Sequence, residues 1–207
     1  MIAIIQARSN SKRLRNKVMR LINNKTMIAH VHDRIKKSKS IKKIFVATSK
    51  NKTDDKLVSH LKKKKINSFR GDLNNVAKRL LSLAKNKKAK YFIRISGDSP
   101  LIDYKIIDRA CRLLLKSKNK YDIITNLFPR TFPKGQSVEI IKTSTLNRNI
   151  KNFSKDEKEH VTKYFYNNAP KFKIRNFYFN GIKKKINQSV DTKKDLTLLI
   201  KKFKDKL

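Results

Sequence analysis

The chain has 207 residues, with 54 Lys or Arg against 15 Asp or Glu, so its formal net charge is +39 at pH 7. A hydrophobic content of 38% can build a buried core, and the length suits one domain covering residues 1–207. The single cysteine, Cys111, excludes an intrachain disulfide and a cysteine-based zinc cluster. No stretch approaches the ~20 apolar residues that span a bilayer, so we expect a soluble, cytoplasmic protein without a membrane span.

The positive charge is weak evidence for a nucleic-acid partner. Lysine is spread over nearly every segment, and the chain has no tryptophan and no recognisable nucleic-acid module. A non-enzymatic protein that binds nucleic acid or another polyanion therefore stays an alternative, and it predicts binding that weakens steeply with salt.

Apolar runs rich in Ile, Val and Phe alternate with segments whose apolar residues recur at helical spacing. Parallel neighbours need crossover connections, so this order predicts an α/β fold with a mainly parallel sheet and helices on both faces. In chain order, the first half predicts a strand at 2–7, a helix at 26–37, a strand at 41–48, a helix from about 54, a strand at 66–71, a helix at 74–85, a strand at 90–96 and a helix at 104–116.

The second half of the chain is less regular. Its turn-rich stretch 128–136 lies between two short apolar runs. The pattern predicts strands at 121–126 and 137–141, helical segments at 143–152 and 155–168, a strand near 172–179 and a last helix from about 192.

Positive charge gathers directly after the first predicted strand, at Arg8, Lys12, Arg13, Arg15 and Lys17. Parallel sheets bind ligands at the carboxyl ends of their strands, which is where these cations would lie. The four glycines of the chain are too far apart for a glycine-rich phosphate loop. A phosphate bound here would be held largely by side chains, with arginine making forked contacts and lysine acting as a point charge.

The spacing Q-A-R-x-x-S-x-R-x-x-x-K at residues 6–17 resembles the opening motif of the cytidylyltransferase family. This family includes acylneuraminate and 3-deoxy-manno-octulosonate cytidylyltransferases and proteins of spore-coat polysaccharide synthesis, and the likeness is strongest to the spore-coat type. Further stretches fit in the same order: "VATS" at 46–49, "FRGDLNNVAKR" at 69–79, "RISGDSPLID" at 94–103, "RTFPKGQSVE" at 130–139, "EHVT" at 159–162 and "VDTKKDL" at 190–196.

The resemblance implies a fold and an activity. The fold is the three-layer, Rossmann-like fold of nucleotide-diphospho-sugar transferases, which is GT-A-like. The activity is a nucleotidyl transfer in which CTP and a sugar or sugar acid give a CMP-sugar and pyrophosphate with the help of Mg²⁺, for surface polysaccharide or glycan synthesis. It also implies a homodimer. In-line attack on the α-phosphorus needs cations and a metal more than it needs a covalent nucleophile.

The same resemblance assigns roles to residues. Catalysis falls to Arg8, Lys17 and Asp98, and the metal would be held by Asp98 and Asp191. Nucleotide binding is assigned to Gln6, Ala7, Arg8, Ser11, Arg13, Lys17, Gly71, Asp72 and Arg94, and binding of the acceptor sugar to Arg130, Gln136, Glu139 and His160.

Structural alternatives stand beside these roles. Asp98 could cap the helix that follows Pro100, and Asp191 could cap the last helix, in which Asp195 reads as a first-turn acid. Arg94 could reach the nucleotide or pair with a buried carboxylate. The opening cations could form a solvated loop, and the acceptor residues a polar surface hairpin.

The chain departs from the family pattern at five positions. Asn tolerates a left-handed backbone better than most residues, so the opening loop could keep its shape without the usual glycine. A nucleotide-sugar-dependent glycosyltransferase is a further alternative, although the chain lacks the Asp-x-Asp triplet that many of these enzymes use, and the departures also leave open an inactive relative. The five positions are Asn10, Arg15, Asn16, Lys158 and Asn187.

Overall fold

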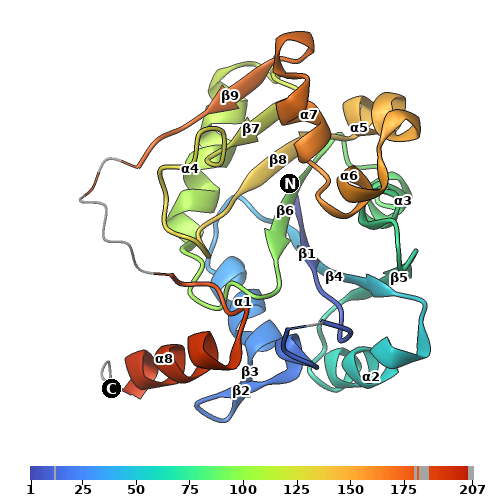
Figure 1. Cartoon of the computed structure of the whole chain (residues 1–207). Helices are drawn as coiled ribbons and strands as arrows, with labels where there is room; N and C mark the ends of the chain where they lie inside the picture. The colour runs from blue at the N-terminus through green and yellow to red at the C-terminus, as the bar shows by residue number, and fades with distance from the viewer. Residues whose placement is uncertain (12, 180, 182–186, 205–207) are drawn as a thin grey trace.

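A parallel sheet forms the centre of the molecule. The computed structural model describes residues 1–11, 13–179, 181 and 187–204, so Lys12 of the opening cluster lies outside the described residues. The larger sheet has seven strands in the order β5-β4-β1-β6-β8-β7-β9 (Figure 1). Its parallel half consists of β1 (Ile2–Gln6), β4 (Lys43–Ser49), β5 (Ser68–Gly71) and β6 (Tyr91–Ser96), as the sequence predicts.

One strand of the sheet runs against the others. β8 (Glu139–Lys142) is antiparallel to β6 and to β7 (Ile123–Thr125), whereas β9 (Ile174–Asn176) is parallel to β7 and forms the edge. The sheet is therefore mainly parallel, which confirms the predicted α/β class.

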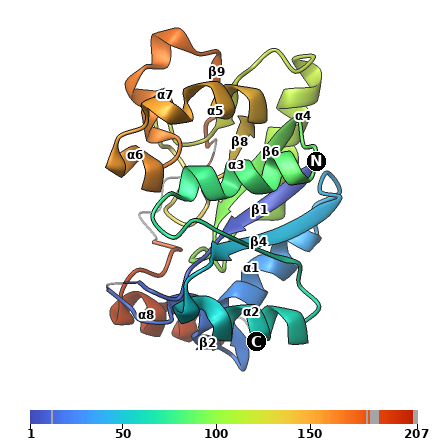
Figure 2. The same ribbon diagram turned by 90° about the vertical axis from the view of Figure 1, so that its right-hand side faces the viewer.

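Helices cover both faces of the sheet and complete three layers (Figure 2). The helices on these faces turn an apolar stripe to the sheet, as amphipathic helices of α/β folds do. On one face the core includes side chains of α1 (Met27–Lys36), α2 (Asp55–Lys63) and α4 (Tyr104–Lys116), and on the other face side chains of α3 (Val76–Asn86), α5 (Thr143–Asn149) and α7 (Lys163–Asn167).

The start of α3 illustrates how local sequence sets an element. Asn75 precedes the helix, and its side-chain oxygen accepts a hydrogen bond of 2.8 Å from the backbone N–H of Lys78. Asn75 is therefore the N-cap of α3. Short 3₁₀ turns occur elsewhere at η1 (Lys17–Met19), η2 (Lys52–Asp54), η3 (Ile150–Asn152) and η4 (Ala169–Lys171).

A small hairpin and the last helix lie below the main sheet in Figure 1. β2 (Leu21–Ile22) pairs with β3 (Lys25–Thr26), and the apolar face of α8 (Lys193–Lys204) packs near this hairpin through Leu199. Strands of two residues are too short to show a period, so the sequence pattern does not predict the hairpin. This packing brings the segment before α8 next to the opening loop. Among the described residues, no helix is long and apolar enough to cross a membrane.

The predicted helix 155–168 is interrupted. α6 (Lys155–Glu159) follows a capping box at Ser154 and ends at Glu159, with His160 as its C-cap, and α7 starts at Lys163. Between them Thr162 is buried, with its hydroxyl bonded to Glu139 on β8. This tertiary hydrogen bond lies at the interruption between α6 and α7, which the helical periodicity of the sequence does not predict.

Candidate active site

A cavity of about 430 Å³ opens at the carboxyl ends of β1 and β6. It gathers segments that lie far apart in the sequence, as expected for the ligand side of a parallel sheet. Among the residues with predicted roles, its lining contains Gln6, Ala7, Arg8, Ser11, Arg13, Lys17, Arg94, Asp98, His160 and Asp191.

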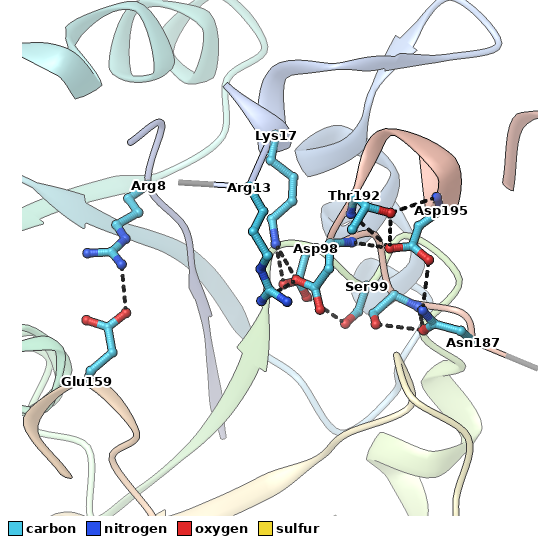
Figure 3. Close-up of polar contacts among 11 residues, drawn as sticks. Arg8, Arg13, Lys17, Asp98, Ser99, Glu159, Asn187, Thr192 and Asp195 are labelled. Atoms are coloured by element: carbon cyan, nitrogen blue, oxygen red, sulfur yellow. Dashed lines mark hydrogen bonds and ion pairs between the residues drawn. The ribbon is translucent and has the colours of Figure 1, made fainter. Parts of the chain in front are cut away.

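Two carboxylates converge on one ammonium group in this cavity. Lys17 Nζ lies 2.9 Å from Asp98 Oδ2 and 3.0 Å from Asp191 Oδ1, and Arg13 Nη2 lies 3.3 Å from the same Asp191 oxygen. Figure 3 shows the side chains of Lys17 and Arg13 pointing toward Asp98. Burial alone would lower the pKa of Lys17, but the two carboxylates outweigh it, so the pKa is raised and Lys17 stays charged.

Asp98 and Asp191 are free of the capping roles that sequence left open. Asp103 caps α4, accepting a 2.9 Å hydrogen bond from the backbone N–H of Lys105. At the start of α8, Asp195 accepts bonds from the backbone N–H groups of Asp191 and Thr192 at 3.0 and 2.8 Å, which leaves the Asp191 carboxylate directed at the cations.

Close packing sets the position of Asp98. The backbone N–H of Gly97 donates to Gln6 O at 2.9 Å, and a Cβ at this position would lie only 3.0 Å from that oxygen and 3.0 Å from Ala7 Cβ. Glycine thus lets the loop after β6 approach the end of β1 closely. The backbone N–H of Val190 donates to Asp98 O at 2.9 Å, which places the segment before α8 beside the same loop.

The opening loop is anchored by a buried carboxylate for which sequence analysis assigns no role. Asp54 is 0% exposed and accepts hydrogen bonds from Ser9 N at 2.7 Å, Thr48 Oγ1 at 2.8 Å and both the N–H and the hydroxyl of Ser49. Burial raises the pKa of Asp54, but these donors outweigh it and hold the pKa below its usual value. Farther along the loop, Asn16 adopts a left-handed φ of 54°, so it does supply the conformation expected of it.

The opposite part of the cavity holds a second set of charges. Arg8 Nη2 lies 3.0 Å from Glu159 Oε1, apart from the Lys17 cluster (Figure 3). Arg79 of α3 also lines the cavity but is only 1% exposed. Sequence analysis includes Arg79 in a matching stretch and gives it no role, because an arginine within a helix normally reads as a surface residue.

Gly71 and Asp72 contact Arg79 and are absent from the cavity lining. Asp72 O accepts a hydrogen bond of 2.9 Å from Arg79 Nη1, while the Asp72 carboxylate accepts from the backbone N–H groups of Asn74 and Asn75. The structure shows Gly71 and Asp72 in contact with Arg79, and their expected contact with the nucleotide stays a prediction.

A second cavity, of about 310 Å³, shares Arg94, Ser96 and His160 with the first. Arg94 donates to Glu139 and, through Nε, to Gln6 Oε1 at 2.9 Å. It therefore pairs with a buried carboxylate and also lines both cavities, so the two alternatives for Arg94 are compatible. The other residues around this second cavity are Leu127, Arg130, Ser137, Glu139, Thr162, Lys163 and Tyr166.

Glu139 is the centre of the polar wall of the second cavity. It is 1% exposed, and its Oε1 accepts hydrogen bonds from Thr162 Oγ1 at 2.5 Å and Tyr166 Oη at 2.8 Å. Burial and the nearby Glu139 charge raise the pKa of Tyr166 well above its usual value, so the phenol stays a donor.

Gln136, which sequence analysis assigns to binding of the acceptor sugar, lies outside the lining of both cavities. Its amide is buried, donates to Leu101 O at 2.7 Å and accepts from the backbone N–H of Asp103 at 2.8 Å. This amide joins two loops, and the expected contact of Gln136 with the sugar stays a prediction.

The charge pattern fits a hard divalent cation. The described residues contain no group of three or more His, Cys, Asp or Glu side chains arranged around one position. Mg²⁺, however, is commonly held by one or two carboxylates, with water and substrate phosphates as its other ligands. Asp98 and Asp191 already direct oxygens at a single cation, so this donor set suits Mg²⁺.

A Rossmann-like sheet with a polar cavity at its strand ends and clustered cations agrees with the nucleotidyltransferase that the sequence resemblance implies. Residues 2–206 match the family described as cytidylyltransferase, and the chain belongs to that family. The protein is accordingly an enzyme, a cytidylyltransferase, and the resemblance seen in the sequence is confirmed.

Three curated relatives illustrate the family. An uncharacterized protein of Methanocaldococcus jannaschii is 34% identical over 204 residues, covering 96% of this chain and 81% of the relative. The spore coat polysaccharide biosynthesis protein SpsF of Bacillus subtilis is 28% identical over 178 residues, covering 83% and 72%. The 3-deoxy-manno-octulosonate cytidylyltransferase of Thermodesulfovibrio yellowstonii is 31% identical over 144 residues, covering 62% of this chain and 52% of the relative.

A solved structure agrees with this assignment. A cytidylyltransferase from Leptospira borgpetersenii superposes with a TM-score of 0.89 at 29% identity, covering 99% of this chain and 94% of the other.

Proposed function

We propose that this cytidylyltransferase joins CTP to a sugar or sugar acid, giving a CMP-sugar and pyrophosphate in a Mg²⁺-dependent reaction. The observation that carries the proposal is the convergence of Asp98 and Asp191 on one cation position, beside the cations of the opening loop. Relatives named for spore-coat polysaccharide synthesis and for octulosonate cytidylyl transfer support a product used for surface polysaccharide or glycan synthesis.

The chemistry requires the protein to hold negative charge. A hydroxyl oxygen of the acceptor attacks the α-phosphorus of CTP, the bond to the bridging oxygen breaks, and pyrophosphate leaves while the hydroxyl proton is lost. Mg²⁺ bound by Asp98 and Asp191 would neutralise charge on the phosphate oxygens. Arg8, Arg13 and Lys17 lie where they can bind the rest of the triphosphate.

Ligand binding must change the partners of these cations. In this structure Lys17 is paired with both carboxylates and Arg8 with Glu159. We infer that the triphosphate draws the Lys17 ammonium and the Arg8 guanidinium away from these carboxylates, which frees Asp98 and Asp191 for the metal. Each cation and each carboxylate thereby exchanges one ion-pair partner for another, and none is left unpaired in the cavity.

The second cavity suits an acidic acceptor. Among the residues that the structure describes, Arg130 is in no ion pair, and its guanidinium donates one hydrogen bond, to Ser137 Oγ at 3.2 Å. Burial lowers the pKa of Arg130, an effect that a nearby carboxylate would offset. A sugar acid could place its carboxylate against this guanidinium. Its hydroxyl would then face the first cavity, which His160 lines together with the second. A homodimer remains a proposal that rests on the family resemblance, and a cytoplasmic location remains a separate proposal.

The test is calorimetric titration with CTP, UTP, ATP and GTP, with and without Mg²⁺, at near-physiological salt. We expect selective CTP binding that Mg²⁺ strengthens, and loss of the Mg²⁺ effect in Asp98→Asn. Asp103→Asn is the matched control, because Asp103 caps α4 and lies outside the cavity lining. Equal, weak and salt-sensitive binding of all four nucleotides would contradict the proposal and favour a polyanion binder. Selective binding would be followed by pyrophosphate release with a panel of sugars and sugar acids.

A further inference from the structure

Arg79 is a buried guanidinium with unsatisfied donors. Its side chain is 1% exposed and borders the large cavity. Nη1 donates to Asp72 O at 2.9 Å, whereas Nε and Nη2 have no hydrogen-bond partner among the described residues. Buried polar groups are almost always hydrogen-bonded, and an unmet charged donor is especially unfavourable. The two free donors therefore point to a partner that the protein alone does not supply.

The two free donors have a defined geometry. Nε–H and the adjacent N–H of Nη2 lie side by side on one edge of the planar guanidinium and point the same way. Such an edge matches two neighbouring acceptor atoms on one planar group. Because Nη1 is already occupied, this edge is the part of Arg79 that is left for a ligand.

The place of Arg79 in the sheet separates it from the metal position. Arg79 packs against Gly71 at the end of β5, and Asp98 follows β6. In the strand order β5-β4-β1-β6 these ends are three strand spacings apart, which is about 14 Å. A nucleotide whose phosphates lie at Asp98 and Asp191 would have to extend along the strand ends to approach Arg79 with its base.

The charges around Arg79 favour a neutral group over a phosphate. Glu159, which lines the same cavity, and the buried Asp54 are the acidic groups whose charges act most strongly on Arg79, while Arg8 opposes them. These carboxylates would repel a phosphate placed directly at the Arg79 guanidinium. The cations that face the metal position, Arg13 and Lys17, serve phosphate at the other end.

We propose that Nε and Nη2 of Arg79 donate to the adjacent acceptors N3 and O2 of the cytosine ring and so select CTP over UTP. The proposal rests on the proposed function, since it names the base-reading residue of the same site. Uracil offers a donor at N3, so it would leave one Arg79 N–H facing another N–H. A bidentate contact of this kind discriminates by roughly 10- to 100-fold.

The first test removes the two-donor edge of the Arg79 guanidinium but keeps the positive charge. Arg79→Lys is titrated with CTP, UTP and inorganic tripolyphosphate, and thermal unfolding verifies that it folds. We expect CTP affinity to fall roughly 10- to 100-fold, with UTP and tripolyphosphate changed by less than about 3-fold. Arg109→Lys is the matched control, because Arg109 also donates to a backbone carbonyl but lies on α4, outside this cavity. A parallel loss for all three ligands would assign Arg79 to phosphate, and unchanged affinities would assign it to structure; either result overturns the proposal.

The second test uses the unchanged protein. 3-Deaza-CTP carries a C–H in place of the N3 acceptor and keeps O2 and the amino group, so we expect it to bind about 10-fold more weakly than CTP. Equal binding of the two would overturn the contact to N3 even if Arg79→Lys failed to fold. Failure of the wild-type protein to prefer CTP over UTP would defeat the proposed function itself, whereas CTP preference that persists in Arg79→Lys would defeat the assignment of Arg79 alone.

Discussion

The two ends of the large cavity differ in whether their charged side chains have partners within the protein. At the metal end, Lys17 is bonded to both Asp98 and Asp191, so the carboxylates and the ammonium neutralise one another before a ligand arrives. At the other end, Arg79 is buried with two donors unmet among the described residues. Ligand binding must therefore exchange partners at the first end and add partners at the second. Substitutions at the two ends should have different consequences.

Removing a carboxylate at the metal end should have the largest effect. Asp98→Asn keeps the size of the side chain but removes a charge from the metal position, and metal stabilisation of a phosphoryl transition state amounts to several kcal/mol. We expect turnover with CTP and a competent acceptor to fall about 1,000-fold, measured as pyrophosphate release. Asp103→Asn should stay within a few-fold of wild type. An equal loss in both variants would mean that the loop, and not the carboxylate, matters.

Removing the ammonium should separate metal binding from catalysis. In Lys17→Met the two carboxylates no longer share a protein cation, so affinity for Mg²⁺ in the absence of nucleotide should rise. Turnover should fall roughly 10- to 100-fold, because a charge-assisted hydrogen bond to the triphosphate is lost. Mg²⁺ titration and steady-state kinetics measure the two effects, with Lys25→Met as a control, since Lys25 pairs with Asp33 away from the cavity. Unchanged Mg²⁺ affinity would contradict partner exchange.

At the other end, the anchor of the opening loop should matter for stability. Asp54→Asn weakens hydrogen bonds to a buried carboxylate, and we expect the free energy of unfolding to fall by about 2 kcal/mol at pH 7. The folded state lowers the pKa of Asp54, so this contribution is present above the usual carboxyl value near 4 and disappears as the pH falls through the folded pKa.

Urea unfolding between pH 3 and 7 measures this dependence. The stability difference between wild type and Asp54→Asn should be constant near neutrality and shrink below about pH 4. Asp55→Asn is the neighbouring control: its carboxylate is 55% exposed and pairs with Arg70, so its effect should stay below about 1 kcal/mol. A difference that persists unchanged at pH 3 would argue against a carboxylate anchor.

Asp54 and Arg79 also mark where prediction from sequence ends. The parallel sheet follows from apolar periodicity, and the meeting of Asp98 with Lys17 follows from the rule that ligand residues lie at strand ends. An Asp at a helix start reads as a cap, however, and an Arg among α3 residues reads as solvated. Their burial depends on tertiary packing that no local pattern records. Sequence analysis missed the break before Lys163 and the burial of Gln136 between two loops for the same reason.

The smallest predicted effect tests the support of Arg79. A Cβ at Gly71 would lie 2.8 Å from Arg79 Cγ and 3.1 Å from Arg79 Cβ, so Gly71→Ala must push the arginine or its helix away from β5. Overpacking of this kind costs about 1 kcal/mol where the neighbour can move, and the displaced fork should reduce the CTP-to-UTP preference. Ser68→Ala, at an exposed position of the same strand, should change neither.

Stability and nucleotide preference must be measured together, because they respond to different parts of Arg79. Loss of stability reports displaced packing around the Arg79 stem, whereas loss of CTP preference reports a displaced guanidinium edge. If Gly71→Ala destabilised the protein and kept its full CTP preference, the base contact would not depend on the position of Arg79. The unmet donors at this end of the cavity would then need another partner, and the contrast with the self-neutralised metal end would no longer explain base selection.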